Sequence, residues 1–295
     1  MENLQPKEKK IKYTPIILRK ERNQPVIPEQ NPDKNVYFRH SANAGDLIYS
    51  LPSIRESVRF SGKRAVIYQV LDEPCKYWGA DHPIGDVMFN AYMFRICKPL
   101  IEAQDYVERF EVWDCQQATY NIDMIREPLI SKELGMPFGD IRQWVMMYYP
   151  ELQACIGEAW LELEKPVSKT DLIVVNRTSR YRNHKINYEF LQKIDLPIAF
   201  IGVSGEYKEF MKEVPRAEFV KTNDLMQAAR VIAGSKLFIG NQSSCFAIAE
   251  GLGTARVLEV CPEAPNVIPA TPNGYLFRDQ KGFEALVKLR LGLQQ

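Results

Sequence analysis

The feature that most constrains the fold of this chain is a regular alternation of short apolar runs and helical patterns after residue 170. The predicted strands are residues 172–176, 198–203, 218–221, 237–240 and 256–260, and the predicted helices are residues 188–194, 206–214, 224–233 and 243–252. Strands with so few charges are typical of parallel sheets that helices cover on both faces. The alternation predicts a doubly wound α/β domain, in which ligands bind at the carboxyl ends of the strands.

A similar unit is predicted in the first half of the chain. Residues 36–39 and 65–71 are apolar runs typical of strands, and residues 46–60 between them have helical spacing. A strand, a helix and a strand within so short a stretch predict a right-handed βαβ unit with parallel strands. Further along, we expect helices at residues 88–103 and 141–153 and a strand at residues 109–113.

The length of 295 residues suits two domains of ordinary size. Residues 1–34 combine lysines with several prolines, so we expect an extended N-terminal arm there. We predict a first Rossmann-like domain at residues 35–165 and a second at residues 166–295. The segment 165–169 is the predicted linker.

Charge and cysteine usage narrow the class of protein. The formal net charge is +1, whereas a dedicated nucleic-acid binder usually shows a basic excess. No apolar run approaches the roughly 20 residues that span a bilayer, and the first twelve residues are polar, so we expect a cytoplasmic protein without a membrane span. The six cysteines form no C-x-x-C pair, which favours free thiols over zinc sites or disulfides.

The first candidate motif, residues 41–52, joins the first predicted strand to its helix. Gly45 permits a tight turn, and Asp46 stands at the start of the helix. There a carboxylate can face a cleft or simply cap the helix, and both alternatives stay open.

The second candidate motif, residues 176–185, follows the first strand of the second domain. It contains three arginines, a lysine, two hydroxyls and two amides, which supply many donors for phosphate oxygens. The alternative is a solvated basic loop.

The third candidate motif, residues 240–253, is a strand end that opens a helix. Its N–H groups and positive dipole end suit a pyrophosphate, although Ser243 or Ser244 could be a plain N-cap. Glu259 ends the next strand and could accept hydrogen bonds from a ribose. A serine nucleophile is disfavoured, since the chain has three histidines and no G-x-S-x-G elbow.

Together these segments resemble the glycosyltransferases of the GT-B fold, and among them the heptosyltransferase-like family. The G-D-x-x-x-x-x-P turn of that family is matched by Gly45, Asp46 and Pro52. The resemblance implies two Rossmann-like domains facing across a cleft, with Asp46 as the general base. It implies that residues 35–165 form the acceptor-side domain and that residues 166–295 bind the nucleotide sugar. It implies donor contacts from Asn43, Gly45, Arg177, Thr178, Ser179, Arg182, Glu259 and the backbone amides of Gln242, Ser243 and Ser244.

The sequence departs from the family at the turn that binds the diphosphate. The usual aspartate, small residue, glycine and histidine are replaced by Asn241-Gln242-Ser243-Ser244 and Cys245-Phe246. The donor type and the histidine contact therefore do not carry over. The lysine of the first polar loop is replaced by arginine or shifts to Lys185.

The resemblance implies transfer of a sugar from a nucleotide sugar to an acceptor hydroxyl, with inversion and without a metal or other cofactor. The acceptor stays open among a glycan, a lipid-linked sugar and a modified nucleobase, and the oligomeric state is equally open. Two alternatives keep the fold: a noncatalytic nucleotide or nucleotide-sugar binding protein, and a sugar-nucleotide epimerase.

Overall fold

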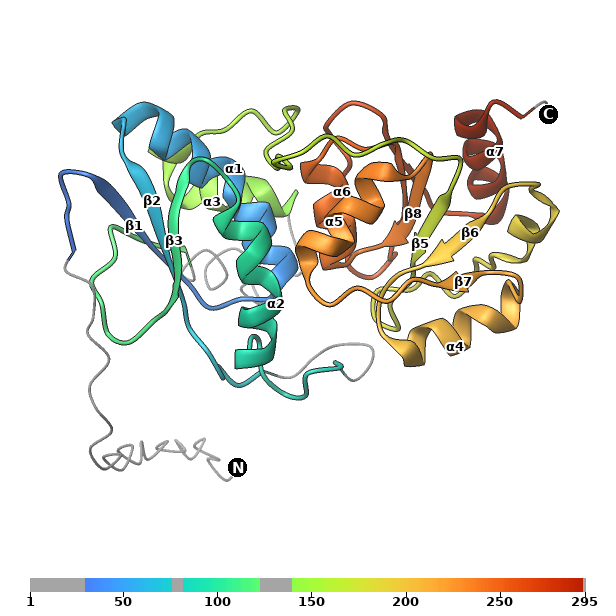
Figure 1. Ribbon diagram of the computed structural model, residues 1–295, viewed down its shortest axis with the longest axis horizontal. Helices are drawn as coiled ribbons and strands as arrows, with labels where there is room; N and C mark the ends of the chain where they lie inside the picture. Colours follow the sequence, from blue (N-terminus) through green and yellow to red (C-terminus); the bar gives the residue numbers. More distant parts are fainter. Residues whose placement is uncertain (1–29, 76–81, 123–139, 294–295) are drawn as a thin grey trace, which may run out of the picture. The chain divides into compact units, whose positions relative to one another are not determined.

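The computed structural model describes residues 30–75, 82–122 and 140–293. It contains a four-stranded sheet from the first half of the chain, with the order β3-β2-β1-β4, and β1, β2 and β3 are labelled in Figure 1. The strands are β1 (Asn35–His40), β2 (Arg64–Gln69), β3 (Val107–Val112) and β4 (Tyr120–Asn121). All three pairings are parallel, and β1 pairs with β2 from Asn35–Arg64 to His40–Gln69. The predicted βαβ unit is therefore present.

Helix α1 (Ala44–Ser61) connects β1 to β2, and α2 (Ala91–Glu102) precedes β3. Asn43 caps the start of α1, and Gly62 ends it with a φ of 68°, a left-handed conformation that glycine adopts without strain. Pro52 lies inside α1 without ending it. The helix therefore begins two residues earlier than predicted and includes the first part of the Gly45-Asp46 motif.

The second sheet has six parallel strands in the order β10-β9-β8-β5-β6-β7. The strands are β5 (Ile173–Asn176), β6 (Ile198–Phe200), β7 (Glu218–Phe219), β8 (Leu237–Asn241), β9 (Arg256–Glu259) and β10 (Gly274–Phe277). The helices are α4 (Ser204–Glu213), α5 (Leu225–Gly234), α6 (Ser244–Gly251) and α7 (Gln280–Leu291). The chain runs outward from β5 to β7 and then returns to β8 on the other side of β5. The topological switch point of this doubly wound sheet therefore lies between β5 and β8.

Some predicted elements differ in extent or kind. The helix predicted at residues 188–194 is a short 3₁₀ helix, η3 (Glu189–Lys193). The one predicted at residues 141–153 divides into α3 (Ile141–Tyr148) and the 3₁₀ turn η2 (Pro150–Leu152), because Pro150 cannot donate the hydrogen bond that would continue α3. Strands β4 and β10 and helix α7 were not predicted.

A single apolar core runs from the first sheet into the second. It contains Phe38 and Leu47 of the first half together with Phe238 and Phe246 of the second. Helix α1 packs on α6, and α2 packs on α5 (Figure 1). A separate cluster with Phe200 covers the opposite face of the second sheet, so that sheet is buried on both faces. The domain boundaries at residues 34–35 and 165–166 stay a prediction.

None of the helices in the described part of the chain combines the length and the apolar character that a membrane span requires.

Candidate functional site

A cavity of about 530 Å³ lies at the carboxyl ends of β5, β6 and β8. Its floor is the topological switch point of the second sheet, the position at which doubly wound sheets bind ligands. Side chains of the first half close it from the other side: His82, Pro83, Ile84, Asn90, Tyr92, Met93 and Ile96. The cavity therefore has walls from both halves of the chain.

The start of α6 forms one wall of this cavity. Ser243 is the N-cap residue, and its Oγ accepts a hydrogen bond from the backbone N–H of Phe246 at 3.2 Å. The same hydroxyl donates to Asn176 Oδ1 at 2.7 Å, which ties the start of α6 to the end of β5. The first N–H groups of α6 have no carbonyl partner within the helix, and together with the helix dipole they favour an anion.

The floor is closely packed because two positions lack a side chain. A Cβ atom added at Gly240 would lie 2.7 Å from the carbonyl oxygen of Asn176. One added at Gly202, whose φ is 135°, would lie 2.7 Å from Asn176 Nδ2. These glycines let β5, β6 and the end of β8 approach one another beneath the cavity.

The polar loop after β5 contributes Thr178, Ser179 and Arg180 to the cavity wall. Asn241 holds this loop, since its Oδ1 accepts from the backbone N–H of Thr178 at 2.9 Å. Its Nδ2 donates to the carbonyl oxygens of Thr178 and Arg180 at 3.0 and 2.7 Å. Asn241 therefore sets the loop conformation through its side chain.

Glu206 and His82, two of the titratable residues that line this cavity, have pKa values shifted by their surroundings. Burial raises the pKa of Glu206 above its usual range, although a hydrogen bond from the backbone N–H of Ser179 at 3.0 Å and the charge of Arg182 oppose the shift. Burial, together with the positive charge of Arg180, lowers the pKa of His82 to about 4. His82 is thus neutral at neutral pH, and among the described residues Arg180 supplies the positive charge at the cavity wall.

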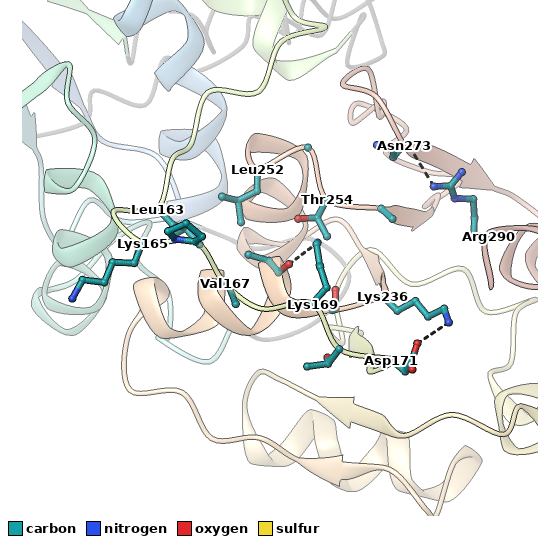
Figure 2. Close-up of a pocket in the computed structure, with 16 residues that line it drawn as sticks. Leu163, Lys165, Val167, Lys169, Asp171, Lys236, Leu252, Thr254, Asn273 and Arg290 are labelled. Carbon is teal, nitrogen blue, oxygen red and sulfur yellow. Dashed lines mark hydrogen bonds and ion pairs between the residues drawn. The ribbon is translucent and has the colours of Figure 1, made fainter. Parts of the chain in front are cut away.

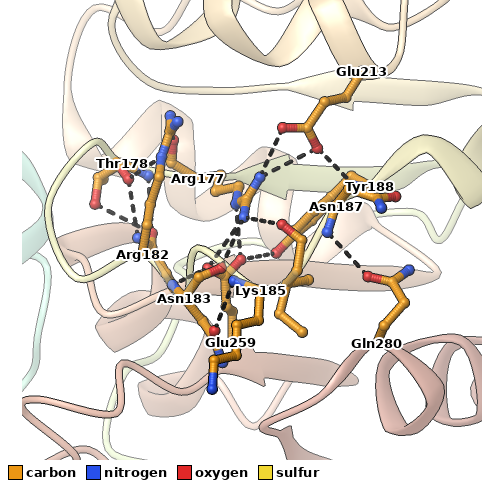
Figure 3. A network of polar contacts seen from close by, with 12 residues as sticks. Arg177, Thr178, Arg182, Asn183, Lys185, Asn187, Tyr188, Glu213, Glu259 and Gln280 are labelled. Atoms are coloured by element: carbon orange, nitrogen blue, oxygen red, sulfur yellow. Dashed lines mark hydrogen bonds and ion pairs between the residues drawn. The ribbon is translucent and has the colours of Figure 1, made fainter.

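Arg177 and Glu259 lie elsewhere, in a buried network beneath the loop (Figure 3). Their exposed fractions are 4% and 0%. Arg177 Nε donates to Glu259 Oε2 at 2.8 Å, its Nη1 contacts Glu213 at 3.0 Å, and its Nη2 donates to the Ile186 carbonyl oxygen at 2.8 Å. The Tyr188 hydroxyl also donates to Glu259 at 2.9 Å. Because neither residue lines the cavity, the predicted contacts with diphosphate and ribose do not fit this placement.

Two further predicted donor residues support neighbouring groups. Arg182 is absent from the cavity wall, and its Nε donates to the carbonyl oxygen of Thr178 at 2.9 Å. Gln242 lines the cavity, and its Nε2 donates to Asn266 Oδ1 at 2.6 Å.

Asp46 and Gly45 lie beside the start of α6. A Cβ atom added at Gly45 would lie 3.7 Å from the backbone nitrogen of Ser244, so the first turns of α1 and α6 are in contact. Asp46 Oδ2 accepts a hydrogen bond from the backbone N–H of Asn43 at 3.0 Å, as in a capping box. Asn43 and Asp46 are half-buried and lie outside the cavity wall itself. The first and third motifs are thus brought together, and Asp46 does cap its helix.

Sequence reasoning missed Glu206, Arg180 and His82 as individual candidates. A signal for Glu206 was present, because it follows the second strand of a βαβ unit, where dinucleotide-binding folds carry the acidic residue that binds ribose. Arg180 is one of three arginines in the loop, and the pattern does not distinguish them. His82 comes from the first half and has no local motif.

A larger hollow, of about 890 Å³, lies at the amino ends of the strands of the second sheet (Figure 2). Two of the lysines that line it already have partners: Lys236 pairs with Asp171 at 2.7 Å, and Lys169 donates to the Ala233 carbonyl oxygen at 2.6 Å. Doubly wound sheets bind their ligands at the opposite edge. We therefore take the cavity at the carboxyl ends as the candidate site.

Across residues 30–75, 82–122 and 140–293, no three histidine, cysteine or acidic side chains gather as a metal site would require. The absence of a metal and of other cofactors stays a prediction.

By sequence, the chain matches no protein-family model and no curated protein. By structure it is similar to the E. coli heptosyltransferase WaaC with ADP, at 11% identity and a TM-score of 0.58 over 87% of this chain and 99% of that chain. It is also similar to E. coli ADP-heptose lps heptosyltransferase II, at 13% identity and a TM-score of 0.55 over 88% and 98% of the two chains. The glycosyl transferase family 9 protein from Veillonella parvula gives 11% identity and a TM-score of 0.55 over 89% and 90%.

These similarities extend over both sheets and confirm the fold predicted from the sequence. The chain has the GT-B fold, a mixed α/β architecture with two parallel sheets.

Proposed function

We propose that this protein is a glycosyltransferase that moves a sugar from a nucleoside diphosphate sugar to an acceptor hydroxyl. The observation that carries the proposal is the cavity at the switch point of the second sheet, where the start of α6, Arg180 and Glu206 converge opposite the first half. Each of these groups suits one part of a nucleotide sugar.

The diphosphate would lie against the start of α6. Backbone N–H groups there stabilise negative charge, and Arg180 adds a guanidinium that can bind phosphate oxygens bidentately. The same groups would stabilise the charge that develops on the leaving diphosphate, so no metal ion is needed for that task. In this proposal Arg180 and the start of α6 take the diphosphate-binding role that the sequence predicted for Arg177.

The ribose would lie against Glu206. Its carboxylate follows β6, the position from which an acidic residue accepts hydrogen bonds from ribose hydroxyls in nucleotide-binding folds. Glu206 thereby replaces Glu259 as the ribose candidate.

Asp46 would act as the general base of an inverting displacement. Its carboxylate takes the proton of the acceptor hydroxyl while that oxygen forms a bond to the anomeric carbon. The bond between this carbon and the diphosphate oxygen breaks on the opposite side, and the leaving diphosphate keeps the electron pair. The contact between the first turns of α1 and α6 supports this assignment, since it brings Asp46 close to the proposed diphosphate site.

The solved structures that share the fold suggest which donor to test first. Three of them are complexes with ADP, ADP-2-deoxy-2-fluoro heptose and ADP-D-beta-D-heptose. We therefore propose an adenosine diphosphate sugar as the first donor class. The sequence leaves the acceptor open, and inversion, the absence of a cofactor and a cytoplasmic location remain predictions from the sequence.

One observation favours a second candidate, a noncatalytic nucleotide-sugar binding protein. Asp46 already accepts the hydrogen bond that caps α1 and lies outside the cavity wall, as a purely structural residue would. An epimerase would act on the donor alone, so analysis of products without an acceptor separates it from a transferase.

Thermal unfolding with ADP, UDP, GDP and their sugars tests the donor site. A ligand at a hundred times its dissociation constant adds about 2.7 kcal/mol to the free energy of unfolding. We expect one nucleotide to stabilise the protein selectively, and Glu206→Gln to reduce that effect. If no nucleotide stabilises the protein, the proposal fails. Asp46→Ala should retain the stabilisation in either case, but it should abolish transfer only in an enzyme.

A further inference from the structure

Four charged side chains form a buried cluster between the two halves of the chain. They are Asp140, Arg142, Glu250 and Arg256, and none has an exposed fraction above 3%. Arg142 Nε lies 2.6 Å from Asp140 Oδ1, and its Nη1 lies 2.9 Å from Glu250 Oε1. Arg256 pairs with the other oxygen of Glu250. The cluster holds two positive and two negative groups, so its charges balance.

The members of the cluster come from elements that are distant in sequence. Asp140 and Arg142 stand at the start of α3, which packs on α1, whereas Glu250 lies in the last turn of α6. Arg142 also donates to the carbonyl oxygen of Ile268 at 2.6 Å, and Glu250 accepts from the backbone N–H of Thr271 at 3.0 Å. Hydrogen bonds with backbone groups therefore fix both partners of the central pair.

A second set of contacts lies beside this cluster. Trp160 Nε1 donates to the carbonyl oxygen of Ile48 in α1 at 3.0 Å. The backbone N–H groups of Trp160 and Leu161 both donate to the carbonyl oxygen of Gly251, at 2.9 and 3.0 Å. A Cβ atom added at Gly251 would lie 2.7 Å from the side chain of Leu161. This segment thus joins α1 to α6 without room for even a methyl group.

Separating the two halves would break all these contacts together. Glu250 would lose Arg142 while still paired with Arg256, and apolar surface of the shared core would meet water. Burial opposes the charge on Arg142, but the hydrogen bond and charge of Asp140, with that of Glu250, outweigh it and raise the pKa of Arg142. The guanidinium of Arg142 therefore stays charged throughout the physiological range.

We propose that Arg142 and Glu250 are positioning residues that hold α1 against α6, so that the site has its working geometry before any ligand binds. The first turn of α1 carries Asp46, and the first turn of α6 carries Ser243 and Ser244. A fixed contact between these helices fixes the separation of base and diphosphate. The two halves then need no closing motion.

Amide hydrogen exchange of the unmodified protein tests whether α1 and α6 are held together, and it needs neither a ligand nor an activity assay. The N–H groups of Trp160 and Leu161 would exchange only when the halves separate. We expect them to exchange as slowly as the N–H groups of β5 and β8, because all would require global unfolding. Exchange of the two amides many times faster than that of the core strands would overturn the proposal.

Glu250→Gln tests the positioning role, with Asp171→Asn as control, since Asp171 forms an exposed ion pair with Lys236. We expect Glu250→Gln to speed exchange at Trp160 and Leu161. A kinetic measurement on Glu250→Gln gives a second readout, which rests on the proposed function. We expect kcat to fall by up to about 100-fold, because a misplaced reacting group slows the reaction by about that factor, while KM for the donor stays nearly unchanged. Equal losses in kcat and 1/KM would contradict the role. If no transfer is detected at all, the proposed function fails, while the exchange result stands on its own.

Discussion

Replacing Arg177 and Arg180 separately by methionine distinguishes a structural arginine from a ligand-binding one three positions away. Arg177 contacts two carboxylates, and its guanidinium lies 4.5 Å from the centroid of the Tyr188 ring. Removing it leaves Glu259, fully buried, without its cation. Breaking a buried pair in this way costs about 3–5 kcal/mol. We expect Arg177→Met to lower the free energy of unfolding by that amount.

Arg180→Met is the matched control. Its side chain is half-buried at the cavity wall, so its loss should change the stability of the unliganded protein by no more than about 0.5 kcal/mol. A hydrogen bond to a charged group contributes about 1.5–3 kcal/mol, so nucleotide affinity should fall by roughly 10- to 150-fold.

Urea unfolding measures the loss of stability expected for Arg177→Met, and titration calorimetry measures the loss of nucleotide affinity expected for Arg180→Met. In urea, Arg177→Met should lower the transition midpoint with an unchanged slope. Calorimetry should use whichever of ADP, UDP and GDP stabilises the unmodified protein. The reasoning is refuted if Arg177→Met weakens nucleotide binding at full stability while Arg180→Met leaves binding unchanged.

Three further substitutions test the packing and electrostatics around the site. The buried Tyr49 hydroxyl has no hydrogen-bond partner among the described residues, so Tyr49→Phe should leave stability unchanged or raise it by about 1 kcal/mol in urea unfolding; a clear loss would reveal a partner. The folded protein keeps His82 neutral down to about pH 4, whereas the unfolded chain binds the proton below about pH 6.5. The free energy of unfolding should therefore decline as the pH falls from about 6.5 to about 4. We expect a decline of about 1 kcal/mol, because partial exposure of His82 weakens the effect. Unfolding measured across this pH range should show no such contribution in His82→Gln. Gly240→Ala places a methyl group 2.7 Å from the Asn176 carbonyl oxygen and should cost about 1–3 kcal/mol, whereas Gly205→Ala, with open space around it, should be neutral or stabilising; equal thermal shifts would contradict this.

The periodicity of the sequence was sufficient to predict most of the second sheet. Strands such as Ile173–Asn176 are short, apolar and separated by helical patterns, and the five strands predicted for this sheet are all present. Helix α7 was missed although Phe283, Val287 and Leu291 recur at helical spacing and Asp279 caps it. Strand β10, which precedes α7, was also missed, because it contains only four residues and begins with glycine, which gives a weak strand pattern.

The site was predicted at the level of loops but not of side chains. The loop after β5 and the start of α6 do line the cavity, as the doubly wound topology requires. Which arginine faces the cavity depends on how the loop folds. Asn241, in β8, sets the loop conformation through hydrogen bonds to Thr178 and Arg180, which are more than 60 positions away in the sequence. Glu259 was selected because it ends a strand, but burial beside Arg177 made it part of the core.

The most direct test of the central claim is a crystal structure of the protein with the nucleoside diphosphate that stabilises it most. We predict the diphosphate at the start of α6, within hydrogen-bond distance of the Ser244 amide and the Arg180 guanidinium, with the ribose against Glu206. A nucleotide bound elsewhere, such as in the hollow at the amino ends of the strands, would contradict the account.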